Sequence, residues 1–383
     1  MLTEDERKEF AEAIEAIYQQ LEFDVMNDIV RRISLAKEIT RTADWQLYQI
    51  SQLRTYNVDL RKKIQKALKL SDAEMQKLYD QVLAEGYARD EALYQAVGVP
   101  FTPFWDNVAL QQVIRAVEKQ TENDFMNITR TTGFVLSGNG LEVQTCSDYF
   151  RNQLNRATIE IMSGTFNYDE TLKRITNEMA NSGLRQIDYA SGHHDRIDVA
   201  TRRAVMTGLG QVTAKVTEEN AEKLQTDYYE VSAHLAARPS HAIWQGKVYT
   251  MDQLISICGL GTGPGLCGWN CYHHYDPFIP GISVRKYSDE YLSNLYQKTL
   301  EKHEYKDEEY TMYEATQRQR ALERKMRVQD EKIRLMKQGG APSDEIKRLK
   351  LKRTATYQEY REFSKAMGLP EQMNRVFNSE PKR

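Results

Sequence analysis

The stretch Ala237-Arg-Pro-Ser-His241-Ala-Ile-Trp-Gln-Gly246-Lys-Val-Tyr249, followed by Cys267-Gly-Trp-Asn-Cys271-Tyr-His-His274, decides the fold because it separates two long helical regions. Residues 193–281 hold six of the seven histidines and three of the four cysteines. Five glycines and one proline fall within residues 258–268, so this segment cannot be a regular helix. We expect a small α+β domain at residues 191–286, with short strands at 228–232 and 247–251.

Residues 1–190 are expected to form a helical N-terminal region with little strand signal. Apolar residues recur every three or four positions from Phe10 to Val25 and from Leu110 to Phe125, which is the spacing of a buried helix face. Further helices are predicted at residues 41–68, 106–131, 148–162, 168–179 and 197–224.

Three local signals interrupt this pattern. Ser71 and Glu74 match a capping box, which would begin a new helix there. Three glycines within residues 133–140 predict a loop or a short hairpin. Gly208 and Gly210 predict a weak point in the helix that contains them.

Residues 287–383 are expected to form long polar helices, at 289–337 and 343–367. A polar helix as long as the first has too narrow an apolar stripe to pack alone into a globular core, so we expect it to lie along a partner or in a coiled coil. From residue 311 to 383 there are 18 Lys and Arg against 10 Asp and Glu, a net charge of +8 (18 − 10). This basic arm is a candidate for contact with DNA phosphates, through Arg324, Lys325, Arg327, Lys347, Arg348, Lys350, Lys352 and Arg353.

Composition excludes several classes of protein. The 383 residues carry a net charge of −3, so the whole molecule is not a basic nucleic-acid binder. No apolar run of eighteen residues is present, so no transmembrane helix is expected. The charged start, Met1-Leu-Thr-Glu-Asp-Glu-Arg-Lys, lacks a signal-peptide core, and we expect synthesis in a reducing cytoplasm. Four cysteines in so long a chain are not a disulfide framework.

The cysteines and histidines of the central domain are candidate zinc ligands. Two or more thiolates and imidazoles in tetrahedral geometry cross-link domains that have few regular elements. The three-residue gap between Cys267 and Cys271 differs from the usual two, so the favoured interpretation is no cofactor, with buried thiols and hydrogen-bonded imidazoles. Both interpretations stay open for His241, Cys258, Cys267, Cys271 and His273, with His234 as an alternative to His241.

No catalytic residue is expected. Ser240 and His241 are neighbours in sequence, and adjacent side chains point apart on an extended segment. The chain has no Gly-x-Ser-x-Gly elbow, and the glycine-rich loop lacks the Lys-Ser/Thr of a phosphate-binding loop. Asp198 and Arg202 stand at the i,i+4 spacing of a helical ion pair, on a face that we expect to be solvated or to meet a partner.

The central motifs resemble the phage head-morphogenesis domain, the family named for the F protein of phage Mu. Arg238-Pro-Ser-His241, Gly246-Lys247, Asn270-Cys271 and the closing Pro277-x-x-Pro280-Gly281 carry this resemblance over about 90 residues. The longer pattern is similar to phage minor capsid proteins of Gram-positive bacteria. Tyr272-His273 stands where the family usually has Arg-Cys, so the second cysteine of the family is missing there. Either Cys267 replaces it, or the remaining motif residues have a purely structural role.

The resemblance implies a structural protein of the virion, made in the host cytoplasm, which acts at the portal vertex or in the head interior. It implies a role in head assembly and in DNA packaging or retention, with portal, capsid or scaffolding proteins, other copies and packaged DNA as partners. The alternative is a virion-associated zinc-dependent hydrolase, a nuclease or a peptidoglycan-active enzyme.

The motif residues are then expected to hold loops and to offer a partner surface. Arg238 is expected to pair with a carboxylate, and Trp244 and Trp269 to act as apolar anchors. The full set comprises Arg238, Pro239, Ser240, His241, Trp244, Gly246, Lys247, Gly268, Trp269, Asn270, Cys271, Pro277, Pro280 and Gly281.

Overall fold

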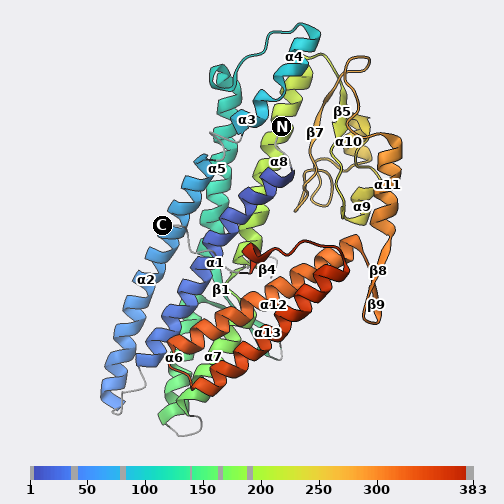
Figure 1. Cartoon of the computed structure of the whole chain (residues 1–383). Coiled ribbons are helices and arrows are strands. Elements are labelled where there is room, and N and C mark those ends of the chain that lie inside the picture. Colours follow the sequence, from blue (N-terminus) through green and yellow to red (C-terminus); the bar gives the residue numbers. More distant parts are fainter. Residues whose placement is uncertain are drawn as a thin grey trace.

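The computed structural model describes residues 4–35, 42–77, 83–138, 140–162, 167–187 and 193–376. It confirms a mainly α-helical protein with a small α+β portion (Figure 1). The helices are α1 (Glu4–Leu35), α2 (Thr42–Lys77), α3 (Leu83–Ala88), α4 (Glu91–Val97), α5 (Val108–Arg130), α6 (Cys146–Met162), α7 (Tyr168–Ser182), α8 (Ile197–Lys223), α9 (Pro239–Ala242), α10 (Met251–Ser256), α11 (Asp289–Leu300), α12 (Met312–Gln338) and α13 (Ser343–Ala366), with 3-10 turns η3 (Phe104–Asp106) and η4 (Met373–Arg375).

Helix α1 lies at the centre of the largest apolar core, with α2, α5 and α8 running beside it (Figure 1). The predicted stripe from Phe10 to Val25 faces the core, with Ile17 half-buried and its other members buried, and Tyr18 and Met26 are buried beside it. The ring of Tyr18 contacts that of Phe125 on α5, with centroids 5.6 Å apart. A helix that is apolar on several faces must be surrounded, which is why α1 is enclosed by neighbours.

The helix predicted for residues 41–68 is longer, and the predicted helix start at Ser71 is wrong. Helix α2 continues through this position to Lys77. The Ser71 hydroxyl is fully buried and donates to the backbone oxygen of Leu68 at 2.8 Å, with Tyr18 Oη 3.2 Å away. A serine hydroxyl that bonds to the preceding turn and to a neighbouring helix is compatible with a helix interior.

The N-terminal part also contains a four-stranded sheet, of which the sequence indicated only a hairpin. Strands β1 (Thr132–Gly138) and β2 (Gly140–Thr145) form the short hairpin that was one of the two expected structures, with Gly133 paired to Thr145. Strands β3 (Arg185–Ile187) and β4 (His194–Arg196) extend it in the order β2-β1-β3-β4. Strands of three residues carry too little periodicity to be recognised before their partners are known.

A second sheet and two short helices form the central module, which we define as residues 228–284. Strand β5 (Tyr228–Val231) lies between β6 (Val248–Thr250) and β7 (Tyr275–Phe278), all antiparallel. Pro277 stands opposite Tyr229 on the edge strand β7, where a missing backbone N–H is tolerated. The strands β5 and β6 confirm the two predicted ones, while β7 was not predicted.

The predicted single helix at residues 289–337 is wrong. Helix α11 ends at Leu300, and a hairpin of β8 (Lys302–Tyr305) and β9 (Glu308–Thr311) precedes α12. Tyr305 and Tyr310 of this hairpin each contact the Phe363 ring on α13, at 5.2 Å between centroids. This aromatic packing favours the hairpin over continued helix, and it depends on contacts across more than fifty positions of sequence.

The C-terminal helices are packed against the rest of the chain and do not extend freely. Helices α12 and α13 pair with each other, and α12 also contacts α1 and α7 (Figure 1). Leu322 and Met326 of α12 form a core with α13, whereas Leu335 and Met336 join the main core. The domain boundaries at residues 190 and 286 remain a prediction. Within the described residues, no helix is long and apolar enough to span a membrane.

A buried network of charges joins α1, α8 and α12. Asp198 on α8 pairs with Arg327 on α12 at 2.6 Å, and Arg196 pairs with Glu22 on α1. The expected pair of Asp198 with Arg202 does not form, because Arg202 pairs with Glu15 on α1 at 2.9 Å. The face of α8 that was expected to be solvated or to meet a partner is therefore buried between two helices of the same chain.

This network makes the stability of the fold depend on pH. Burial raises the pKa of Glu331 on α12 to about 8, and the nearby Glu22 carboxylate adds to the rise. A carboxyl group whose pKa rises on folding stabilises fully below its unfolded pKa and loses that contribution as the pH rises through the folded pKa. We expect the free energy of unfolding to decrease between about pH 4.5 and about pH 8.

The substitution Glu331→Gln tests this dependence. Urea unfolding across the same pH range should show a flatter slope, and the variant should be more stable than the parent above about pH 8. Glu345→Gln is the control, since Lys173 lowers the pKa of Glu345. An unchanged slope in Glu331→Gln would contradict the assignment.

Candidate Cys/His centre in the central module

The short helix α9 places His241 inside the module and Ser240 outside it. Arg238 is the residue before the helix, and Pro239 occupies its first turn, where a proline needs no hydrogen-bond donor. His241 is 2% exposed, whereas Ser240 is exposed to solvent. The two neighbours point apart, so Ser240 and His241 do not form a nucleophile and its base.

The glycine-rich loop is tightly turned and brings Cys271 to His241. Several backbone hydrogen bonds close it, among them Leu266 N–H to Cys258 O at 2.9 Å and Trp269 N–H to Gly263 O at 2.6 Å. Gly268 is required at its position because an added Cβ would lie 2.2 Å from the Gly263 carbonyl oxygen. Cys271 N–H then donates to Gly268 O at 3.1 Å, which orients the Cys271 side chain inward.

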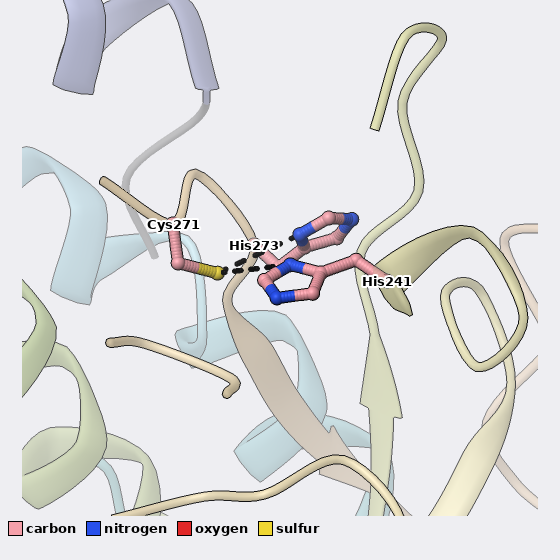
Figure 2. Close-up of side chains that lie close together, drawn as sticks. All are labelled: His241, Cys271 and His273. Carbon is pink, nitrogen blue, oxygen red and sulfur yellow. Dashed lines mark hydrogen bonds between the residues drawn. The ribbon is translucent and has the colours of Figure 1, made fainter. Parts of the chain in front are cut away.

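Three buried side chains converge at the centre of the module (Figure 2). The Sγ atom of Cys271 lies 3.8 Å from Nδ1 of His241 and 3.6 Å from Nδ1 of His273. The donor atoms of the three residues all lie within 4.8 Å of one another. We call this group the Cys/His cluster; it joins α9 to the segment that leads into β7.

The far nitrogen of each imidazole is held by an oxygen. Nε2 of His241 lies 2.8 Å from the backbone oxygen of Pro264. Nε2 of His273 lies 3.1 Å from Oε1 of Gln245, and this same Oε1 accepts the backbone N–H of His234 at 3.0 Å. The two rings are thus fixed in orientation from outside the cluster.

Aromatic rings enclose the cluster on its other sides. Trp244 contacts the rings of His241 and His273, at 4.6 and 4.9 Å between centroids, and the ring of His234 lies 4.3 Å from that of His273. Burial accordingly lowers the pKa of His241 to about 4 and that of His273 well below its usual range. Both imidazoles are neutral at physiological pH.

Some neighbours of the Cys271 sulfur raise the pKa of its thiol, and others lower it. Burial raises the pKa of the Cys271 thiol, while hydrogen bonds from the backbone of His273 and Cys267 and the charge of Arg7 act to lower it. The Arg7 guanidinium is itself buried and donates to Thr213 on α8 at 2.8 Å. The N-terminal helix therefore supplies a positive charge near the cluster.

Two of the five candidate ligands lie outside the cluster. Cys258 is part of the apolar core beneath the sheet, and burial raises its thiol pKa to about 12. Cys267 directs its Sγ toward the backbone oxygen of His273 at 3.6 Å. Sequence spacing placed these thiols near Cys271 without indicating which way each side chain points.

The other motif residues hold loops. Arg238 donates to the backbone oxygen of Trp269 at 2.9 Å, and no carboxylate partner for it occurs among the described contacts, so the expected acid pair is not found. Lys247 caps α9 through Ile243 O at 2.9 Å. Gly246 has a φ of 74° and lies against Leu292, where an added Cβ would be 2.3 Å from a methyl group. Asn270 has a positive φ of 52°, and Pro280 and Gly281 lie exposed after β7.

Gln245 and Pro264 are parts of the centre that the sequence reasoning missed. The only sequence signal for Gln245 is its position four residues after His241, which places the two on one side of a helical turn. Pro264 contributes its backbone oxygen, and because every residue has one, the sequence gives no signal for this contact. Contacts made by backbone atoms depend on the folded path of the loop.

A cavity of about 480 Å³ adjoins the cluster. His241, Cys271 and His273 line it, together with residues from α1, α8 and α12. Its walls carry charges of both signs: the cationic residues are Lys8, Arg202, Arg238, Arg320, Arg324, Arg327 and Arg375, and the acidic residues are Glu15, Asp198 and Glu323. The cluster is therefore buried in the protein and still borders a polar space.

The candidate DNA-contacting residues divide into two groups. Arg327 and Arg353 are buried and paired with Asp198 and Asp330, at 2.6 and 2.9 Å, so neither guanidinium is available to a phosphate. The others are exposed, and Lys325, Lys347 and Arg348 pair with neighbouring carboxylates at the surface.

The fold and the cluster define the class: a mainly helical protein that carries a small, loop-built module around a buried Cys/His cluster. The family model of phage minor capsid protein 2 matches residues 2–364, which is nearly the whole chain, and the chain belongs to this family. No curated protein and no solved structure matches it. The resemblance to phage minor capsid proteins is confirmed, and the protein is a structural component of a bacteriophage virion.

Proposed function

We propose that this minor capsid protein acts at the portal vertex or in the head interior, where it contacts the portal and assists head assembly and DNA packaging or retention. The observation that supports a contact role is the surface of the central module. Eight large apolar side chains of the module are exposed to solvent, namely Tyr228, Leu235, Ile243, Ile255, Ile257, Trp269, Ile282 and Val284. Protein interfaces bury such side chains, and a rigid module presents them at low cost in entropy.

The packing of α12 and α13 against each other and against α1 and α7 also favours the central module as the surface that contacts head proteins. These helices were expected to reach a partner, but their apolar faces are already covered by each other and by α1 and α7. Their exposed outer face is cationic, with Lys350 and Lys352 on α13. Contact with packaged DNA is thus proposed for this face, and contact with head proteins for the module.

Co-expression with the portal protein of the same phage tests the proposal. The double substitution Ile257→Glu and Val284→Glu places charges on residues that are 52% and 88% exposed, so the fold should be retained. A charge buried at an interface costs well over 1.4 kcal/mol, so co-purified portal should fall by about tenfold or more.

Leu351→Glu is the matched control, because Leu351 is 69% exposed and lies on α13, outside the module. It should co-purify with as much portal protein as the parent chain does. Equal recovery from the parent and the double variant would reject the module as the portal contact. Failure of the parent itself to associate with any head protein would reject the proposed role.

A further inference from the structure

The hydrogen bonds around the Cys/His cluster fix where each imidazole carries its proton. The backbone oxygen of Pro264 only accepts, so Nε2 of His241 must donate to it. Oε1 of Gln245 already accepts the His234 N–H, so it is the amide oxygen, and Nε2 of His273 must also donate. A neutral imidazole that donates from Nε2 has a bare lone pair on Nδ1, so each of these rings turns an acceptor nitrogen toward the interior of the cluster.

These two lone pairs point at a single sulfur atom. Nδ1 of His241 and Nδ1 of His273 lie 3.8 and 3.6 Å from Sγ of Cys271 (Figure 2). One thiol has one proton and can donate it to only one nitrogen. Without a further positive species, one buried lone pair would stay unsatisfied, which is unfavourable in the interior of a protein.

We propose that Cys271, His241 and His273 bind a Zn²⁺ ion through Sγ and the two Nδ1 atoms. Zinc bonds of about 2.3 Å to sulfur and 2.0–2.1 Å to nitrogen, at a tetrahedral angle, separate the sulfur from each nitrogen by about 3.6 Å. The separations in the structure are 3.6 and 3.8 Å. Both sulfur–nitrogen separations are therefore close to those of a bound zinc ion.

The surroundings of the cluster match those of a metal site. Histidines that bind metals usually donate their other N–H to an oxygen, which fixes the ring, and Pro264 and Gln245 supply those oxygens here. The three residues border the cavity, so a water molecule there completes the fourth position.

The ion would connect two segments that are 30 positions apart in sequence. It joins His241 on α9, which precedes the glycine-rich loop, to Cys271 and His273, which follow the loop and lead into β7. The ion would therefore link the two ends of the loop. Binding to the folded state alone stabilises that state by mass action. This inference is independent of the proposed portal contact, and either can fail without the other.

Cobalt provides the test, because Co²⁺ occupies zinc sites and absorbs light. The purified full-length chain is treated with a chelator, dialysed and titrated with Co²⁺. We expect one equivalent to bind, with the intense visible absorption of tetrahedral cobalt and a thiolate charge-transfer band in the near ultraviolet. Zn²⁺ should displace it and raise the Tm of the chelated protein by about 5 °C.

Three variants assign the ligands. Cys271→Ser should abolish the charge-transfer band, and Gln245→Leu, which removes only the support of His273, should weaken binding about 10- to 100-fold. Cys258→Ser is the control, a buried thiol of the same module outside the cluster, and should retain the band. Absence of stoichiometric binding in the parent protein, or a thiolate band retained in Cys271→Ser, would overturn the proposal. The titrations of the parent and of Gln245→Leu decide it even if Cys271→Ser does not fold.

Discussion

Replacing Asp198 with alanine should destabilise the protein by about 3–5 kcal/mol, because it leaves the buried guanidinium of Arg327 without its carboxylate partner. Asp198 is 4% exposed and lies 2.6 Å from Arg327 and 3.9 Å from Arg196. Burial alone would raise its pKa, but these two guanidiniums outweigh burial and lower the pKa to about 2. Urea unfolding at neutral pH measures the loss of stability.

The direction of the pH dependence follows from the same pKa. A carboxylate whose pKa is lowered on folding stabilises above its unfolded pKa, and this contribution is lost as the pH falls toward about 2. The difference between the parent and Asp198→Ala should therefore shrink in acid.

A surface ion pair is the control for Asp198. Glu359 pairs with Arg318 at 2.8 Å, and its side chain is 26% exposed. Glu359→Ala should cost no more than about 1 kcal/mol, as exposed pairs do. The double substitution Asp198→Leu and Arg327→Met should recover part of the loss, because it removes both charges. A cost for Asp198→Ala as small as that of Glu359→Ala would show that the network does not hold α8 to α12.

Replacing Trp244 with alanine should cost about 3–5 kcal/mol, the range for a large buried aromatic side chain. Trp244 is 4% exposed, belongs to the core of the module, and contacts both histidines of the Cys/His cluster. Its removal should open a cavity beside the cluster. Unfolding followed by far-ultraviolet circular dichroism is suitable, because that signal does not depend on tryptophan.

Trp269 provides the matched comparison, since the motifs alone treat the two tryptophans as equivalent anchors. Trp269 is 57% exposed and lies over the backbone of Gly263, where an added Cβ would come within 2.6 Å of the ring. Trp269→Ala should cost about 1 kcal/mol or less, because little of the ring leaves water on folding. A loss for Trp244→Ala as small as the loss for Trp269→Ala would mean that the module core does not depend on Trp244.

The sequence by itself determined the long helices and the irregular module. Apolar residues at three- and four-residue spacing predicted α5, α6, α7 and α13 within a few positions, because that signal is local to each helix. The glycines and proline of residues 258–268 predicted a loop, since they restrict the backbone whatever surrounds them. The motif pair likewise indicated the family before any contact was known.

Only the tertiary structure decided the short strands, the buried charges and the membership of the Cys/His cluster. Strand β3 pairs with β1 across some fifty positions, and Tyr305 and Tyr310 break a polar helix by packing on Phe363. Asp198 was expected to pair with Arg202 on its own helix, yet α1 and α12 supply the partners of both. Five residues were candidate ligands, and backbone hydrogen bonds of the glycine-rich loop bring three of them together. In each case the stabilising contact joins segments distant in sequence, so its free energy appears only when the chain is folded.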